Sequence, residues 1–301
     1  MTLQPEKSEN YKVAIQGFAG AFHDMAARKF FDNQSIDILP CHTFRESFDM
    51  VKSKKADIAI VAIENSLGGS LLPNYSLLKS SSLWVAGEIY LRIEQNIMAL
   101  PGQSLSGIKE IHSHPMAIIQ CEEYLEPFRK RNIKIVDSTD TALSAKWISE
   151  NQLKGYAALA SELAAEMYQL EILGKGIETN KRNFTRFLAL TQHDRKEEMV
   201  PYEPDSEPDK SSICFSLPHK TGSLSQILSV LAFYNINLTK IQSAPIIGKE
   251  WEYFFYVDLI FDAFERYQKA LEAISPLIDQ LQVLGEYHSG NNHTFALNKQ
   301  E

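Results

Sequence analysis

Short apolar runs alternate with helix-like segments from residue 13 to residue 190. The run Ile58–Ile63 is continuously apolar, which is typical of a strand buried on both faces of a parallel sheet. Other strands are predicted at 13–15, 84–93, 96–100, 133–136, 155–159 and 185–190, and helices at 23–31, 44–53, 116–128, 140–148 and 161–168. Strands that alternate with helices predict an α/β architecture.

The pattern changes after residue 192. Between residues 193 and 211 charged residues dominate and three prolines occur, which predicts an interdomain linker. Beyond it we predict strand 212–217, helix 223–234, strands 237–244 and 251–261, helix 264–280 and strand 282–287. This βαββαβ order is typical of a ferredoxin-like module. The residues after His288 are polar and predict a loose tail.

The chain has 30 Lys and Arg against 38 Asp and Glu, a net charge of −8. This balance argues against a nucleic-acid partner and against an anionic membrane surface, since both need clustered positive charge. An anionic ligand must then be bound by local charges, and Lys181, Arg182 and Arg186 place three within six residues.

The three cysteines, Cys41, Cys121 and Cys214, lie far apart in the sequence. Their spacing predicts buried thiols and suggests neither a disulfide framework nor a metal site. The first ten residues are polar, and no apolar run reaches the length of a membrane span. We therefore expect a cytoplasmic protein without an export signal and without membrane contact.

The segment Asn183-Phe184-Thr185-Arg186-Phe187 places one hydroxyl and one guanidinium between two aromatic rings. An arginine matches the geometry of a carboxylate, and a positioned threonine hydroxyl can assist a leaving group. The same pattern also fits an ordinary amphipathic strand. Its meaning therefore depends on the rest of the chain.

Further polar groups follow predicted strands. Glu64-Asn65-Ser66 ends the buried strand, where open α/β sheets place ligands, although a turn that caps the next helix is an equally good reading. The loop Gly17–Ala21 can donate backbone N–H groups to an anion. Ser113-His114-Pro115 forms a loop, and Asp140 or Thr141 is expected to cap a helix.

In this order the motifs resemble prephenate dehydratase with a C-terminal ACT regulatory domain, over about residues 11–289. The resemblance is carried by Ile63–Ser66, Ser113–Pro115 with Gln120-Cys121, Asn183–Phe187, Gly222–Leu224 and Asn237–Ile241. It implies two α/β lobes similar to those of periplasmic binding proteins, with the active site between them. Lobe one would comprise about residues 11–90 and 178–192, lobe two about 91–177, and the ACT domain 212–289.

The resemblance implies the decarboxylative dehydration of prephenate to phenylpyruvate, a step of phenylalanine biosynthesis, by a carbon–oxygen lyase that uses no metal or organic cofactor. It assigns Thr185 as the hydrogen-bond donor to the leaving hydroxyl. Substrate contacts are implied for Phe187, Asn65, Ser66, Ser113, Thr141 and Asn183, and Arg186 would orient a substrate carboxylate or stabilise the cleft. We expect Glu64 to pair with a basic residue or to fix backbone N–H groups across the lobes, and His114 to hydrogen-bond locally.

Two departures from the family pattern leave questions open. The first loop usually reads Gly-Pro-Glu-Gly-Thr-Phe-Ser, whereas this chain has Ala21 and His23 in place of the two hydroxyl residues. The choice between prephenate and arogenate, which carries an amino group in place of the keto oxygen, therefore stays open. In the tail, Gln242-Ser243-Ala244-Pro245 replaces a usual Glu-Ser-Arg-Pro.

Feedback inhibition by L-phenylalanine is a hypothesis, because Gly222, Ser223, Leu224, Asn237 and Leu238 still offer amide groups to an amino acid. A homodimer or homotetramer is expected from the resemblance. The competing function is a non-catalytic amino-acid-sensing protein, since two lobes and an ACT module can bind without reacting. Such a sensor would not need Thr185.

Overall fold

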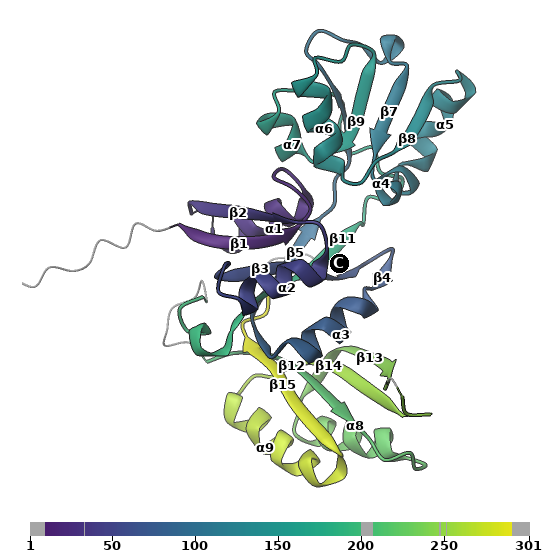
Figure 1. Ribbon diagram of the computed structural model, residues 1–301. Helices are drawn as coiled ribbons and strands as arrows, with labels where there is room; N and C mark the ends of the chain where they lie inside the picture. Colours follow the sequence, from purple (N-terminus) through teal and green to yellow (C-terminus); the bar gives the residue numbers. More distant parts are fainter. Residues whose placement is uncertain (1–9, 33, 200–206, 247, 251, 291–301) are drawn as a thin grey trace, which may run out of the picture.

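The computed structural model describes residues 10–32, 34–199, 207–246, 248–250 and 252–290. They form three sheets, arranged as two α/β lobes and a C-terminal domain, with the first lobe in the middle (Figure 1). Residues 1–9, most of the predicted tail and residues 200–206 of the predicted linker lie outside the described residues.

The first lobe is built on the sheet β2-β1-β3-β11-β5, with the short β4 paired to β3. Its strands are β1 (Tyr11–Gln16), β2 (Ile36–Cys41), β3 (Ile58–Asn65), β4 (Gly69–Ser70), β5 (Leu83–Arg92) and β11 (Phe184–Gln192), and its helices are α1 (Phe22–Phe30), α2 (Phe44–Lys52) and α3 (Leu72–Ser81). Strand β3 is buried as predicted, but its sheet is mixed and not purely parallel, since β3 pairs parallel to β1 and antiparallel to β11. β11 returns from the second lobe at the opposite end and therefore runs antiparallel to β3.

The second lobe has the sheet order β10-β6-β9-β7-β8. Its elements are β6 (Asn96–Ala99), η1 (Leu105–Gly107), β7 (Glu110–Ser113), α4 (Pro115–Gln120), α5 (Glu122–Lys130), β8 (Lys134–Asp137), α6 (Thr141–Glu150), β9 (Tyr156–Ala160), α7 (Glu162–Met167) and β10 (Glu171–Gly174). The helix predicted at 116–128 is thus two helices. The chain turns at Cys121, so that Ile118 and Leu125 both reach the core of this lobe.

Two chain crossings join the lobes, one between β5 and β6 and one between β10 and β11. The buried carboxylate of Glu178 connects them, because it accepts hydrogen bonds from the backbone N–H of Gln95 at 2.9 Å and from Arg92 at 3.2 Å. These hydrogen bonds therefore tie the two crossings to each other where the lobes meet.

The C-terminal domain has the predicted βαββαβ order and an antiparallel sheet β13-β14-β12-β15. Its elements are β12 (Lys210–Ser216), α8 (Ser223–Phe233), β13 (Asn237–Pro245), β14 (Tyr253–Ile260), α9 (Phe264–Ile274), η3 (Ser275–Leu277) and β15 (Gln280–Tyr287). Helix α9 ends six residues earlier than predicted, where Pro276 enters a 3₁₀ turn. Strand β12 begins inside the predicted linker, because Lys210 is buried against the first lobe.

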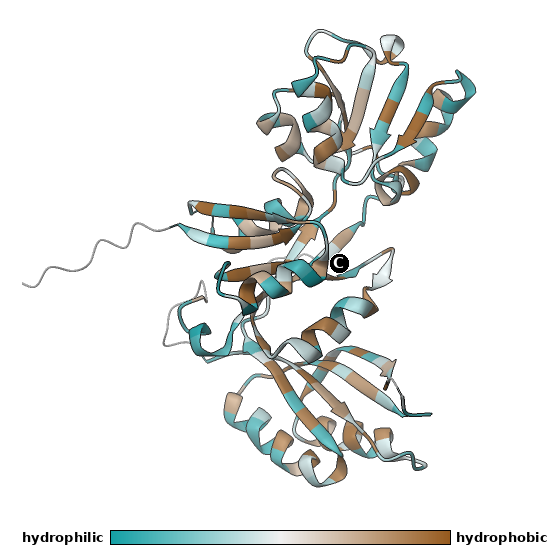
Figure 2. Cartoon of the chain, in the orientation of Figure 1, coloured by the Kyte–Doolittle hydropathy of each residue, from teal (hydrophilic) through white to brown (hydrophobic). Residues whose placement is uncertain are grey.

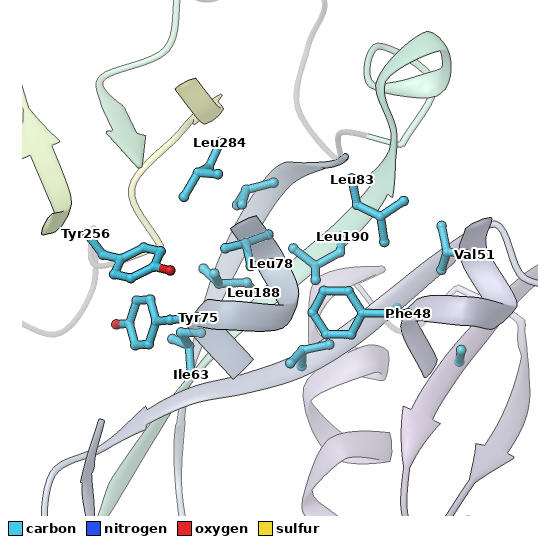
Figure 3. Close-up of a cluster of buried hydrophobic side chains, with 14 of the residues drawn as sticks. Phe48, Val51, Ile63, Tyr75, Leu78, Leu83, Leu188, Leu190, Tyr256 and Leu284 are labelled. Atoms are coloured by element: carbon cyan, nitrogen blue, oxygen red, sulfur yellow. The ribbon is translucent and has the colours of Figure 1, made fainter. Parts of the chain in front are cut away.

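The first lobe and the C-terminal domain share a hydrophobic core, which Figure 3 shows around Tyr75 of α3 and Tyr256 of β14. Their ring centroids lie 5.1 Å apart, and Leu284 of β15 belongs to the same cluster. A Cβ atom at Gly285 would collide with the carbonyl oxygen of Val85, so β15 packs directly on the backbone of β5.

Elsewhere the surface helices are amphipathic. Figure 2 shows hydrophobic and hydrophilic residues alternating along α9, and Tyr267, Ala270 and Ile274 are its buried positions. A spacing of three and four residues places these side chains on one face, which packs on the sheet of the C-terminal domain.

Candidate active site

A cavity of about 680 Å³ opens between the two lobes. Its size is that of a small-molecule site. The wall includes Gln16, Ala21, His23, Thr43, Ala62, Asn65, Thr185 and Phe187 of the first lobe, Gln95 at the crossing, and His114, Met116, Gln120, Asp140 and Thr141 of the second lobe.

Thr185 and Phe187 face this cavity from β11. Asn65 donates a hydrogen bond from Nδ2 to Oγ1 of Thr185, at 3.0 Å. A hydroxyl can accept one bond and still donate its own proton. The Thr185 hydroxyl is therefore oriented by Asn65 and remains able to donate to a bound molecule.

Arg186 does not face the cavity, and the predicted substrate contact of this side chain is wrong. Successive side chains of a strand point to opposite faces, so Thr185 and Arg186 cannot share a side. The guanidinium of Arg186 is buried behind the sheet, where it donates to Glu88 at 2.6 Å and also pairs with Asp258 of β14. These two acids outweigh the effect of burial and hold the pKa of Arg186 well above its ordinary value.

Asn65 is the predicted polar residue at the end of β3 that does face the cavity. Its Oδ1 accepts hydrogen bonds from the backbone N–H groups of Leu67 and Gly68, and its Nδ2 donates to Oδ1 of Asn183 at 2.8 Å. The side chain is thus fixed on both sides, as a positioned active-site group requires.

Ser66 and Asn183 are not among the described wall residues, so their predicted contact with the substrate is not supported. The Ser66 hydroxyl donates to the carbonyl of Arg182 at 2.8 Å and accepts from the backbone N–H of Phe184 at 2.9 Å. Asn183 is fully buried. Both residues hold the turn that orients Asn65.

In the second lobe, Thr141 lies on the cavity wall and Ser113 does not. Ser113 is fully buried and donates to the carbonyl of Leu159 at 2.7 Å, so its predicted substrate contact is wrong. His114 lines the cavity, and its Nδ1 accepts from the backbone N–H of Met116 at 3.2 Å. The local hydrogen bond expected for His114 is confirmed.

Helices from both lobes begin at the cavity wall, among them α1, α2, α4 and α6. Their first turns present the positive ends of the helix dipoles, although a capping side chain accepts from one backbone N–H in each of α2, α4 and α6. No Lys or Arg side chain is found among the described wall residues. The predicted charge cluster does not supply the cavity either, because the ammonium of Lys181 is bonded to the carbonyls of Gly176 and Glu178. An anion would be held here by helix N-termini.

Asp140 is the N-cap of α6, as expected, and its Oδ1 accepts from the backbone N–H of Leu143 at 2.9 Å. Burial raises the pKa of this carboxyl, although the N–H groups of the first helical turn counteract the rise. Asp140 is the acidic side chain among the described wall residues, so its carboxylate places one negative charge at the cavity.

His23, Gln95 and Gln120 are among the wall residues that were not predicted as ligands. His23 packs edge-on against Phe187, with ring centroids 5.0 Å apart, and burial lowers the pKa of its imidazole to about 4. Nε2 of Gln95 donates to Oε1 of Gln120 at 3.2 Å. Two features of the sequence could have pointed to these residues: the unusual histidine in the first loop, which is His23, and the presence of Gln120 in a family motif.

Glu64 pairs with a basic residue, as expected, but the partner belongs to the C-terminal domain. Its Oε1 lies 2.5 Å from Nζ of Lys240. The predicted regulatory residues lie apart within one chain. Gly222, Ser223 and Leu224 stand at the start of α8, whereas Asn237 and Leu238 follow its end, and an eleven-residue helix is about 16 Å long.

Cys41, Cys121 and Cys214 are buried and unpaired, as predicted. Within the part of the chain that the structure describes, no cluster of three or more His, Cys, Asp or Glu side chains could hold a metal ion. In that same part, no helix is long and apolar enough to cross a membrane.

Comparison with known proteins identifies relatives over nearly the whole chain. The family model for prephenate dehydratase matches residues 13–195. "Arogenate dehydratase/prephenate dehydratase 6, chloroplastic" from Arabidopsis thaliana is 37% identical over 94% of this chain and 70% of its own length. A bifunctional chorismate mutase/prephenate dehydratase from Aquifex aeolicus is 34% identical over 92% of this chain and 73% of its own length.

Two solved structures are also similar. Prephenate dehydratase from Arthrobacter aurescens, in complex with L-Phe, has a TM-score of 0.78 at 26% identity, covering 93% of this chain and 90% of that one. A structure described as GqqA, a novel type of quorum quenching acylase, has a TM-score of 0.79 at 30% identity, covering 92% and 98%. The two-lobed α/β fold expected from the sequence is confirmed.

Proposed function

Because this chain belongs to the prephenate dehydratase family, we propose that its cavity converts prephenate to phenylpyruvate, carbon dioxide and water. The observation that carries the proposal is the Thr185 hydroxyl, which is oriented by Asn65 and faces a cavity bordered by helix N-termini. A hydroxyl donor and a site for an anion are what this reaction needs.

The electrons move in one direction through the ring. The bond between the ring and its carboxylate breaks, its electron pair enters the ring, and the bond from the ring to the hydroxyl breaks at the other end. The carboxylate leaves as carbon dioxide, and the hydroxide takes up a proton and leaves as water. Aromatisation of the ring drives the reaction, so no covalent nucleophile is required.

Thr185 acts on the leaving oxygen in this scheme. A threonine hydroxyl is too weak an acid to protonate that oxygen in the ground state, but its hydrogen bond strengthens as negative charge develops during C–O cleavage. The helix N-termini hold the carboxylates, and Phe187 and Phe44 provide apolar surface for the ring. Binding and orientation supply the rest of the rate enhancement.

The test is phenylpyruvate formation by the wild type, by Thr185→Ala and by Thr191→Ala. We expect Thr185→Ala to lower kcat by about 10²- to 10³-fold, the range for a lost transition-state donor. Thr191 lies on the same strand, where its hydroxyl donates to the carbonyl of Asp57 at 2.9 Å, away from the cavity. Full turnover by Thr185→Ala would favour the non-catalytic sensor instead.

Arogenate is a second candidate substrate, and Asp140 favours it. This carboxylate can pair with the amino group that arogenate has in place of the keto oxygen of prephenate. Ala21, where the family usually has a hydroxyl residue, lies on the same wall. Several relatives carry names of arogenate dehydratases, which supports testing both substrates. A comparison of kcat/KM for prephenate and arogenate decides between them.

An acylase reaction is not favoured by this site. A threonine that attacks an acyl group needs a neighbouring general base. The described hydrogen-bond partner of the Thr185 hydroxyl is the amide nitrogen of Asn65, which is a donor and cannot accept its proton.

We also propose that the C-terminal domain is an ACT regulatory domain that binds L-phenylalanine, the amino acid present in the complex of the Arthrobacter relative. Gly222–Leu224 and Asn237-Leu238 stand at opposite ends of α8, so one small ligand contacts both only if a second copy of the chain supplies one segment. This supports a homodimer or homotetramer. A cytoplasmic location stays a prediction.

A further inference from the structure

Four charged residues alternate in sign where the first lobe meets the C-terminal domain. Glu64 of β3 and Arg186 of β11 are register partners in one sheet, and Lys240 of β13 and Asp258 of β14 are register partners in the other. Glu64 pairs with Lys240 at 2.5 Å, and Arg186 pairs with Asp258. We call these four residues the charge tetrad.

The tetrad lies directly behind the active site. Thr185 and Asn65 are also register partners, and each is the chain neighbour of a tetrad residue, namely Arg186 and Glu64. Because side chains alternate along a strand, Thr185 and Asn65 face the cavity while their neighbours face the C-terminal domain. The C-terminal domain thus holds the two strands that carry the proposed donor and its orienting amide.

The Arg186 side of the tetrad is firmly anchored. Arg186, Glu88, Lys210 and Asp258 are each at most 5% exposed and carry two positive and two negative charges. Lys210 of β12 lies 2.8 Å from Glu88, and the hydroxyl of Tyr287 accepts from Arg186 at 3.0 Å. A buried charge that loses its partner is costly, so these groups must move together.

The Glu64 side is more open and can respond to a ligand. The side chains of Lys240 and Glu64 are 15% and 33% exposed, and Nζ of Lys240 also donates to the hydroxyl of Ser70 at 2.6 Å. Strand β13 begins at Asn237, and its register with β14 shifts between Leu238 and Lys240. The proposed regulatory segment therefore lies two residues from the tetrad.

We infer that the charge tetrad is a positioning device through which the C-terminal domain sets the placement of Thr185 and Asn65, and through which an amino acid bound at Asn237-Leu238 changes turnover. Glu64, Arg186, Lys240 and Asp258 act through Thr185 and Asn65 and do not touch the substrate. The regulatory part rests on the proposed function.

The experiment compares two lysines at the same interface. Lys240→Met removes the tetrad contact, and the exposure of Glu64 avoids leaving a buried unpaired charge. Lys79→Met is the matched control, because Nζ of Lys79 on α3 lies 3.7 Å from the ring centroid of Phe254 on β14, a contact that involves neither β3 nor β11. We expect Lys240→Met to lower kcat for the preferred substrate at least fivefold with KM within twofold, and to weaken inhibition by phenylalanine. Lys79→Met should change kcat and inhibition less than twofold.

A second variant and a second readout complete the test. Glu64→Met should lower kcat as Lys240→Met does, and the double variant Glu64→Met/Lys240→Met should be no slower than Lys240→Met, because each change breaks the contact between Glu64 and Lys240. Hydrogen exchange of the segments 63–66 and 183–187 should be faster in Lys240→Met and unchanged in Lys79→Met. Equal behaviour of the two methionine variants in both kcat and exchange would overturn the inference. A wild type that converts neither prephenate nor arogenate would contradict the proposed function, while the exchange comparison would still decide this inference.

Discussion

At the scale of single residues, Asp140 is the acidic side chain on the described part of the cavity wall. No Lys or Arg lies on that part of the wall to balance its negative charge. Its two roles can be separated, because Asn and Asp are equally good N-caps and only Asp offers a charge to an amino group.

We expect Asp140→Asn to lower kcat/KM for arogenate about tenfold and to leave kcat/KM for prephenate unchanged or higher. About tenfold corresponds to a charge-assisted hydrogen bond of about 1.5 kcal/mol. Steady-state kinetics with both substrates measure this difference. An equal loss for both would show that Asp140 only supports α6.

His23 is the second residue with a measurable signature. In the folded protein burial lowers the pKa of its imidazole to about 4, whereas an unfolded histidine has a pKa of about 6.5. At a pH between these two pKa values, His23 is protonated in the unfolded chain and neutral in the folded chain. Stability must therefore fall as the pH drops from about 6.5 to about 4.

His23→Gln removes this ionisation, so its stability should depend less on pH in that window, by up to about 3 kcal/mol from a shift of about 2.5 pKa units. Urea unfolding at pH 7 and pH 4.5 tests the prediction. His219→Gln, at an exposed position, is the matched control. If both variants keep the wild-type slope, His23 is not buried in its neutral form.

At the scale of elements, the loop between β1 and α1 joins the lobes. The carbonyl of Gly20 accepts from Ser161 at 2.5 Å, and the carbonyl of Ala19 accepts from the hydroxyl of Tyr168 at 2.7 Å. Gly20 has φ +88°, and a Cβ atom there would lie 3.1 Å from Cα of Ala164 on α7. The close approach of the lobes depends on this glycine.

Gly20→Ala should therefore disturb closure of the cavity and lower kcat/KM for the preferred substrate about tenfold, as small misplacements in an active site do. Gly102→Ala is the control for backbone strain alone, since Gly102 has φ +78° and a Cβ atom there would meet no other atom within 4 Å. Measuring kcat/KM of both variants at equal folded fraction separates the effect of lobe contact from the effect of backbone strain. Equal activity of both would mean that the loop does not control closure.

At the scale of the whole molecule, the C-terminal domain is part of the stable unit and not a loosely tethered module. Its sheet shares a hydrophobic core with the first lobe, and Arg186, Glu88, Lys210 and Asp258 form a buried ion cluster across the boundary. We therefore expect both parts to unfold together.

Arg186→Met should lower the free energy of unfolding by about 3–5 kcal/mol, because it leaves Asp258 as a buried charge without its strongest partner. Arg195→Met, which breaks a partly exposed pair with Asp57, should cost at most about 1 kcal/mol. Urea titration of both variants gives the comparison. A loss below about 1 kcal/mol for Arg186→Met would show that the cluster is not buried as described.

The sequence by itself determined most of the local elements and the family. Continuous apolar residues in β3, the N-cap Asp140 and the βαββαβ order were all readable, because strand burial, capping and short connections depend on neighbours in the chain. Helix α3 and the strands β2, β4, β7 and β10 were missed. Strand β2 contains Pro40, and the other three strands have four residues or fewer.

Only the tertiary structure decided the direction of the Thr185-Arg186 pair. Alternation along a strand requires that the two side chains part, but it does not say which of them meets the substrate. That choice depends on Glu88 and Asp258, which lie 98 and 72 residues away from Arg186 in the chain. Lys210 was predicted to lie in the linker but is buried in the structure, where its ammonium pairs with Glu88. The sequence could not show this, because a buried charge is stable only where folding brings its counter-charge close.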